Sequence, residues 1–304
     1  MAQKKYLIVI GGPTASGKTS LSIRLARQFH APILSCDSRQ FFQEMNIGTA
    51  KPTPEELAQA PHHFINSLSV EDEYNVGDFE RDALQYLDEI YTKHDLAIMV
   101  GGSGLYIQAV SEGLDVFPEV TRTIRDEVQA RYESEGIEAL QKELATCDPV
   151  YFGQVDTQNP HRLIRAIAVF RASGRAFSSF FNQKKVKRNF TPIFVLLEWE
   201  RAALYDRINR RVDLMLEAGL VEEAQTLFPL RDRTALQTVG YQELFDYFEG
   251  NTSLEEAVGL IKRNSRRYAK RQMTWFRRDP RWQAFQADDL EGILEYLQQK
   301  MQLS

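Results

Sequence analysis

The sequence predicts an α/β fold, a parallel sheet flanked by helices, with a helical insertion between two of the strands. Short apolar runs at 6–10, 32–36, 96–100 and 193–197 have the length of buried strands. The intervening segments, such as "FERDALQYLDEIY", have helical periodicity. A third observation is the stretch 116–189, which lacks a convincing strand. Alternating strands and helices are typical of a parallel sheet covered on both faces.

The first predicted strand runs directly into a glycine-rich loop, and a helical pattern follows. Residues 12–19, "GPTASGKT", match G-x-x-x-x-G-K-[ST] in the strand–loop–helix context that the motif requires. In such a loop, backbone N–H groups at a helix N-terminus cradle phosphate oxygens, Lys18 supplies a charge, and the Thr19 hydroxyl can ligate Mg²⁺. The motif predicts a P-loop kinase-like core that binds a diphosphate or triphosphate, and it specifies neither ATP nor hydrolysis.

Asp37 follows the second predicted strand, 32–36. In open parallel sheets, ligands bind beyond the carboxyl ends of the strands, so we expect Asp37 near the glycine-rich loop. A carboxylate there could ligate a metal, cap the next helix or act as a general base. Position alone leaves the three roles open.

The third predicted strand, 96–100, leads into "GGSGLY". A phosphate-loop hydrolase would usually carry an Asp for magnesium at this point, but glycines and Ser103 stand there instead. Ordinary NTP hydrolysis is therefore disfavoured. A second backbone-rich surface facing the site and a simple tight turn both fit this string.

Helical patterns fill residues 116–189. The second of them has Asn159 as a plausible cap, Pro160 in the first turn and Gly174 as its stop. The predicted domains are a catalytic core of residues 1–115 and 190–304, with a helical C-terminal part, and a helical, basic insertion of residues 116–189.

The sheet resumes at 193–197, and a long helical tail follows, with a last strand expected near 282–285. In "LYDRINRRVDLML", Arg207 and Arg211 are four residues apart, beside the apolar stripe of the same helix. Such a pair can clamp a leaving phosphate. It fits a solvated helix face equally well.

The net charge of −5 disfavours a nucleic-acid partner, but the basic residues are concentrated. Residues 157–197 and 257–278 each contain eight Lys or Arg and no Asp or Glu. The rest of the chain is strongly acidic. Two localised basic runs predict a polyanionic partner. Solvated helical faces are the alternative.

Composition bounds the remaining possibilities. With 304 residues, 43% hydrophobic and 26% charged, the chain is long enough for one large domain or two. No window approaches the roughly 18 apolar residues of a membrane span, and the N-terminus enters a strand directly, so we expect a cytoplasmic protein without membrane contact. The two cysteines, Cys36 and Cys147, suggest neither a disulfide nor a zinc site.

Taken together, eight stretches resemble the tRNA dimethylallyltransferase family, also called tRNA isopentenyltransferase. The likeness runs from about residue 8 to residue 278, and the stretches are "GPTASGKT", "DSRQFFQEMNIGTAKP", "PHHF", "GGSGLY", "NPHRLIRAI", "RINRRVDLMLEAGLVEEAQ", "LQTVGYQE" and "AKRQMTWFRR". The resemblance implies transfer of a dimethylallyl group from dimethylallyl diphosphate to the exocyclic N6 of the adenosine just 3′ of the anticodon, in tRNAs reading codons that begin with U. Pyrophosphate leaves with Mg²⁺. We expect tRNA as the partner and a monomeric enzyme.

The resemblance also assigns roles by position. It gives diphosphate binding to Gly12, Pro13, Thr14, Ala15, Ser16, Gly17, Lys18, Thr19 and Arg207. It gives catalysis to Asp37, as the acceptor of the amine proton, with Lys18, Thr19 and Arg211, and it makes Thr19 the metal ligand. It gives tRNA contact to Asp37, Ser38, Arg39, Gln40, Ser103, Arg125, Gln158, Asn159, Pro160, His161, Arg162, Gln237, Thr238, Val239, Gly240 and Tyr241.

Two positions depart from the family pattern: Ser103, where Thr is frequent, and Asn66, where Asp is frequent. Three other functions compete with tRNA modification. A small-molecule kinase explains the loop but not the basic runs. A non-catalytic RNA-binding protein does not explain why Lys18, Thr19 and Asp37 are all present. An isopentenyltransferase acting on free adenine nucleotides does not require the basic insertion and tail.

Overall fold

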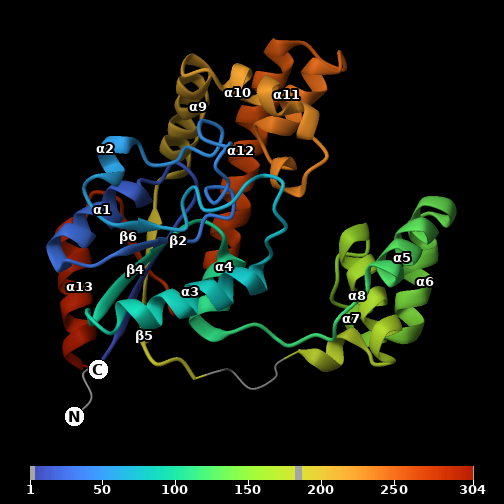
Figure 1. The fold of residues 1–304 in the computed structure, drawn as a ribbon, viewed down its shortest axis with the longest axis horizontal. Helices are drawn as coiled ribbons and strands as arrows, with labels where there is room; N and C mark the ends of the chain where they lie inside the picture. Colours follow the sequence, from blue (N-terminus) through green and yellow to red (C-terminus); the bar gives the residue numbers. More distant parts are fainter. Residues whose placement is uncertain (1–3, 182–186, 304) are drawn as a thin grey trace. The chain divides into compact units, whose positions relative to one another are not determined.

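A computed structural model describes residues 4–181 and 187–303 and divides the chain into two compact units. Unit 1 comprises Met1–Glu112 and Arg188–Ser304, and unit 2 comprises Gly113–Lys187 (Figure 1). Lys184 and Lys185, which belong to the first predicted basic run, lie outside the described residues.

Unit 1 is built on a six-stranded sheet in the order β3-β2-β4-β1-β5-β6, and every strand pair is parallel. The strands are β1 (Tyr6–Gly11), β2 (Ile33–Ser35), β3 (His62–His63), β4 (Leu96–Val100), β5 (Thr191–Glu198) and β6 (Gln283–Gln286). The predicted fold class and all five predicted strands are confirmed. The two-residue edge strand β3 was not predicted, because it has no apolar run.

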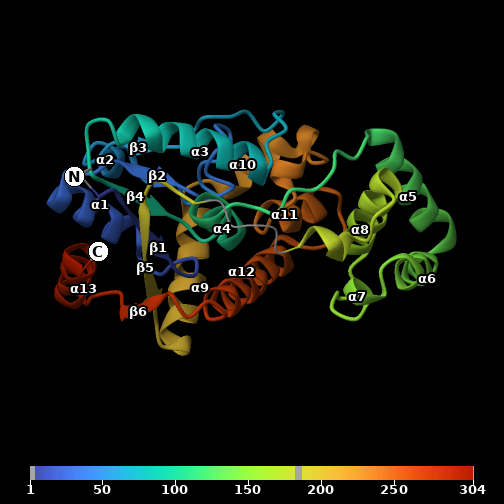
Figure 2. The ribbon, with the colours of Figure 1, turned by 90° about the horizontal axis from the view of Figure 1, so that it is seen from below.

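The sheet is the middle of three layers because its central strands are apolar on both sides. Side chains of β1 alternate between two cores: Leu7 and Val9 face one, and Ile8 and Ile10 the other. Helices α1 (Lys18–Phe29) and α13 (Leu290–Leu303) cover the second face. Helices α3 (Val76–Ile90) and α4 (Gly104–Glu112) cover the first, as Figure 2 shows.

The remaining helices of unit 1 lie beyond the carboxyl ends of the strands (Figure 1). They are α2 (Pro54–Leu57), α9 (Arg201–Glu217), α10 (Leu220–Leu227), α11 (Tyr241–Phe248) and α12 (Leu254–Phe276), with the 3₁₀ turns η2 (Phe228–Leu230) and η3 (Thr234–Leu236). The long helix α12 begins with a capping box between Ser253 and Glu256, and its last residue, Phe276, is buried in the core beside the sheet.

Unit 2 is helical, with α5 (Arg122–Glu135), α6 (Ile137–Cys147), α7 (Pro149–Phe152), α8 (Pro160–Ser173) and the 3₁₀ turn η1 (Phe177–Phe180). Its own core contains Val128, Leu140, Leu144, Leu163 and Ile167. Helix α8 begins at its predicted Asn159 cap and stops at Gly174, whose φ is 68°. Among the described residues, no helix has the length and apolar character needed to cross a bilayer.

Candidate active site

Four segments meet at the carboxyl edge of the sheet because their strands are neighbours. In the order β2-β4-β1-β5, β2 leads to Asp37, β4 to Gly101, β1 to the glycine-rich loop (residues 12–19) and β5 to Trp199. The backbone joins them further, since Gly101 N donates to Ile10 O at 3.1 Å and Cys36 N to Val100 O at 2.8 Å. The topology therefore places Asp37 beside the glycine-rich loop, as the sequence predicts.

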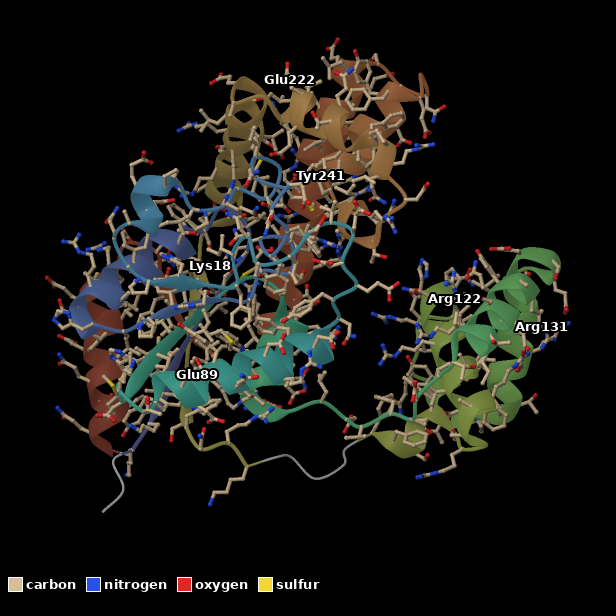
Figure 3. All side chains as sticks on the ribbon, viewed as in Figure 1. Lys18, Glu89, Arg122, Arg131, Glu222 and Tyr241 are labelled. Atoms are coloured by element: carbon tan, nitrogen blue, oxygen red, sulfur yellow. The ribbon has the colours of Figure 1, made fainter. Side chains whose placement is uncertain are left out.

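The glycine-rich loop is compact and tightly folded. Gly17 has a φ of 93°, and even Ala15 has a φ of 63°, in the left-handed region that non-glycine residues rarely adopt. Lys18, labelled in Figure 3, folds back and donates from Nζ to Pro13 O at 2.6 Å. The buried Ser16 Oγ has no hydrogen-bond partner among the described residues. The loop thus contains a buried hydroxyl without a partner and a lysine ammonium group bonded to a carbonyl of the same loop. Both groups are suited to bind the oxygens of an anion.

Side chains from the end of β5 and from α9 donate hydrogen bonds to carbonyl groups of this loop. Trp199 Nε1 donates to Ser16 O at 2.9 Å, and Arg207 Nε donates to Ala15 O at 2.9 Å. The Arg207 guanidinium also lies over the Trp199 ring, 4.3 Å from its centroid. These contacts hold the strained Ala15 in place; Arg207 is exposed, but its guanidinium is nevertheless bonded to the loop.

Lys18, Asp37 and Arg211 form a charged cluster. Burial lowers the pKa of Lys18 from 10.5 to about 8; the nearby Asp37 carboxylate opposes this shift and Arg211 adds to it. Burial likewise lowers the pKa of Arg211, which Asp37 again opposes. Arg211 Nη2 donates to Ala50 O at 3.3 Å. The cluster holds two desolvated cations against one carboxylate, an arrangement that favours an added anion.

Asp37 does not cap a helix, so that alternative is wrong. Residues 38–41 form a turn rather than a helix. Asp37 Oδ1 accepts from Arg39 N at 3.1 Å, which is an Asx turn. The turn fixes the position of the carboxylate near Lys18 and Arg211 while engaging one of its two oxygens.

The glycines after β4 are required by close packing, and their φ angles are ordinary. A Cβ atom on Gly102 would lie 2.1 Å from Gln272 Nε2, and one on Gly104 would lie 2.1 Å from Trp275 Nε1. Gln272 is buried and connects two loops: its Oε1 accepts from Thr14 N at 2.9 Å and its Nε2 donates to Gly102 O at 3.0 Å. The "GGSG" string thus forms a backbone surface that α12 packs on.

Part of the predicted tRNA-contact set lies beside this cluster. Ser103 Oγ accepts from Ser38 N at 3.3 Å, so the serine hydroxyl performs a task that either Ser or Thr could perform. The side chains of Arg39 and Gln40 serve to hold loops together. Arg39 Nη1 donates to the carbonyls of Thr234 and Ala235, at 3.1 and 3.0 Å. Gln40 Nε2 donates to Thr49 O and Ala50 O, at 3.3 Å each.

The predicted contact segment 237–241 is only partly accessible. Gln237 is exposed, Thr238 and Val239 are partly exposed, and Gly240 is buried with a φ of 102°. Tyr241 (Figure 3) is fully buried, so its side chain offers no surface to RNA, contrary to the expectation. Its hydroxyl donates to Glu223 Oε1 at 2.7 Å.

Glu223 is an organising residue that the sequence did not reveal. Its carboxylate accepts from the backbone N–H groups of Asn46, Ile47 and Gly48 at 2.8–2.9 Å, in addition to Tyr241. One side chain on α10 therefore holds the 46–48 turn and α11 together.

The other predicted contact residues belong to unit 2. Arg125 is exposed and donates from Nη2 to Val120 O at 3.0 Å. Asn159 Oδ1 accepts from Arg162 N at 3.3 Å as a helix cap, while Gln158, His161 and Arg162 are exposed and Pro160 is partly so. Apart from Arg125, which is in α5, they cluster at the start of α8, where Gln158, His161 and Arg162 are accessible.

Some basic residues of the two runs form ion pairs within the protein, and others are exposed. In the first run, Arg171 forms two hydrogen bonds with Glu143, and Arg188 pairs with Glu80. In the second, Lys262 pairs with Asp213 at 2.5 Å and Arg277 with Glu198 at 3.0 Å. Arg267, Arg271 and Arg278 are exposed.

Asn66 has a local explanation. It adopts a φ of 55°, which Asn tolerates better than most residues, and its Oδ1 accepts from Lys51 Nζ at 2.5 Å. Burial lowers the pKa of Lys51 to about 8. The neutral Asn66 amide thus accepts a hydrogen bond from the partly desolvated Lys51 ammonium group. An aspartate at this position would instead form an ion pair with it.

Fold and site together define an α/β protein with an all-parallel sheet, whose glycine-rich loop and charged cluster open at the carboxyl ends of the central strands. The family described as IPP transferase matches residues 40–279. The chain belongs to this family.

Relatives and solved structures agree over nearly the whole length. A tRNA dimethylallyltransferase of Christiangramia forsetii is 54% identical, covering 97% of this chain and 98% of the relative. The crystal structure of the tRNA isopentenylpyrophosphate transferase of Bacillus halodurans is 37% identical with a TM-score of 0.73, covering 98% of this chain and 97% of the other. A eukaryotic dimethylallyltransferase acting on tRNA is 27% identical with a TM-score of 0.80, covering 98% and 77%.

Proposed function

We propose that this protein transfers the dimethylallyl group of dimethylallyl diphosphate to the exocyclic N6 of the adenosine 3′-adjacent to the anticodon, in tRNAs reading codons that begin with U. Pyrophosphate is released. The observation that carries the proposal is the cluster of Lys18, Asp37 and Arg211 at the mouth of a glycine-rich loop. Membership of the IPP transferase family supports it.

The loop and its cations suit a diphosphate that departs. Lys18 and Arg211 are desolvated before substrate binds, so each interacts strongly with the charge that grows on the leaving pyrophosphate. Arg207 supports the loop by its hydrogen bond to Ala15 O. A phosphate-loop hydrolase would usually carry an Asp after β4, but Gly101 and Gly102 stand there, which suits a reaction in which water is not the nucleophile.

In this proposal Asp37 accepts the proton of the amine. The N6 lone pair attacks C1 of the allyl group, the C1–O bond breaks, and its electron pair leaves with pyrophosphate. An adenine amine is a weak nucleophile because its lone pair is delocalised into the ring, so the proton must be removed as the new bond forms. The Asx turn presents the Asp37 carboxylate for this step, with Lys18 and Arg211 alongside.

Mg²⁺ fits the residues present as a partner of the diphosphate. Among the described residues there is no group of three or more His, Cys, Asp or Glu that could hold a metal by itself. Mg²⁺ at phosphate sites needs only one or two protein ligands beside phosphate oxygens. The Thr19 hydroxyl, in the first turn of α1 and partly exposed, would supply one. When bound, the ion neutralises charge on the pyrophosphate. The proposal includes a monomeric, cytoplasmic enzyme.

Mass spectrometry of tRNA nucleosides tests the function. Unmodified tRNA is incubated with dimethylallyl diphosphate and Mg²⁺, and a mass increase of one isoprenyl unit on adenosine is expected. Parallel reactions replace tRNA with AMP, or the diphosphate with ATP and a metabolite panel. Transfer to AMP alone would indicate a free-nucleotide enzyme, ATP turnover would indicate a kinase, and RNA binding without any transfer would indicate a non-catalytic protein.

A further inference from the structure

Helix α12 exposes two aromatic rings on one face. Tyr268 is 38% exposed and Trp275 is 41% exposed, and their seven-residue spacing places them two turns apart on the same side. Leu105, in the first turn of α4, is 44% exposed. We call Leu105, Tyr268 and Trp275 the aromatic stripe.

The aromatic stripe adjoins the charged cluster. The Trp275 indole lies so close to Gly104 that a Cβ atom there would be 2.1 Å from Nε1. The preceding residue, Ser103, is bonded to Ser38, next to Asp37. At the other end, the Tyr268 hydroxyl lies near the Asp37 charge and the Ser103 side chain; burial raises its pKa to about 12. Tyr268 thus has its hydroxyl in the site and part of its ring exposed.

Arginines accompany the rings. Arg267 and Arg271 are exposed and four residues apart, on one flank of α12 beside Tyr268, and the exposed Arg278 follows in the turn after the helix. The Arg271 guanidinium lies 5.7 Å from the centroid of the Tyr268 ring. Within the described part of the chain, no carboxylate forms an ion pair with these three arginines. Lys262 of the same helix and Arg277, its C-cap residue, in contrast, are paired with acids.

Exposed flat rings beside unpaired cations complement a flexible polyanion with flat faces. Single-stranded RNA has this character, because unpaired bases stack on aromatic side chains while phosphates meet arginine. Extruding one base into a pocket also deprives its neighbours of a stacking partner, at a cost of a few kcal/mol. A surface of rings beside the pocket would replace that lost stacking.

We propose that the aromatic stripe is a stacking surface for the unpaired RNA bases that flank the acceptor adenosine, with Trp275 as the principal ring. The inference rests on the proposed function, since it requires an RNA acceptor. A protein that covers the stripe is the competing occupant. The flanking arginines favour RNA over a protein, because a partner that buried them would have to supply a matching row of carboxylates.

The test measures binding of an anticodon stem-loop RNA by fluorescence anisotropy, without diphosphate, so that chemistry does not enter. Trp275→Leu keeps an apolar side chain but removes the ring, and should weaken binding about tenfold, within the range for one stacked base. Trp275→Tyr restores a ring and should bind within about twofold of the wild type. Leu254→Ala, at an exposed apolar position at the start of the same helix, is the matched control and should bind normally.

A second RNA, with abasic residues on both sides of the acceptor adenosine, identifies the partner of the ring. Wild-type protein should bind it about tenfold more weakly, and Trp275→Leu should bind it no more weakly than wild type does. Equal affinity of Trp275→Leu and wild type for the intact stem-loop would overturn the inference and favour a protein on the stripe. So would an undiminished effect of Trp275→Leu on the abasic RNA. Absence of both stem-loop binding and transfer in the wild type would instead overturn the proposed function.

Discussion

Replacing Gln272 with Met tests the connection between the two loops at the carboxyl edge. The side chain is only 7% exposed and makes two hydrogen bonds, to Thr14 N and Gly102 O. Met has a similar length and fills the same space, so the change isolates the polar contacts. Each unsatisfied buried group costs about 1–3 kcal/mol. Gly102 O is left buried and bears the full cost, whereas water partly reaches Thr14 N, so we expect a loss of about 3 kcal/mol in the free energy of unfolding.

Urea unfolding followed by circular dichroism measures this loss, and steady-state kinetics follows its effect on the site. The KM for dimethylallyl diphosphate should rise severalfold, because Thr14 is no longer held by α12. Gln299→Met, at an exposed position of α13, is the control and should change stability by less than about 0.5 kcal/mol. A Gln272→Met protein as stable as this control would refute the reasoning, because it would mean that neither backbone group depends on the amide.

Three further outcomes are expected. Asp37→Asn should lower kcat by about 10²–10⁴ with both KM values little changed, and near wild-type turnover would end its assignment as a base; recovery at high Mg²⁺ would make it a metal ligand. Because burial lowers the Lys18 pKa to about 8, the free enzyme loses this charge as pH rises through 8. The Kd for diphosphate, measured by calorimetry, should therefore increase above pH 8 in the wild type and stay flat in Lys18→Ala. Glu223→Gln presents an amide N–H₂ group to backbone donors and should reduce stability by about 2 kcal/mol in urea, with a near-zero change counting against its organising role.

Local sequence patterns predicted the apolar strands of the sheet but not its short edge strand. The five strands with apolar runs could be located because buried parallel strands are continuously hydrophobic, and the Asn159 cap and Gly174 stop of α8 were equally legible. Strand β3 consists of two histidines and is defined only by pairing with β2. No periodicity signals such a strand.

The site shows the same division. The loop motif and the position of Asp37 directly after a strand predicted that Lys18 and Asp37 would be neighbours, because ligands bind beyond the carboxyl ends of parallel strands. The hydrogen bond between Gln272 and Thr14 joins residues 258 positions apart, and no local pattern at either residue predicts the contact. The burial of Tyr241 could not be predicted from the sequence either, because its hydroxyl bonds to Glu223 on a different helix.

The position of β1 in the sheet has a consequence for biosynthesis. One neighbour, β4, is complete by residue 100, but the other, β5, begins at Thr191, after unit 2 has been made. A chain emerging from the ribosome therefore holds its glycine-rich loop on a strand with an open edge for about ninety residues of translation. Gln272 and Trp275 are added later still, so the loop and the glycines after β4 lie uncovered until α12 is made. Because domains generally fold as units during synthesis, unit 2 can form its own core before β5 is made. An interrupted product ending before β5 would present the unpaired edge of β1 to other chains.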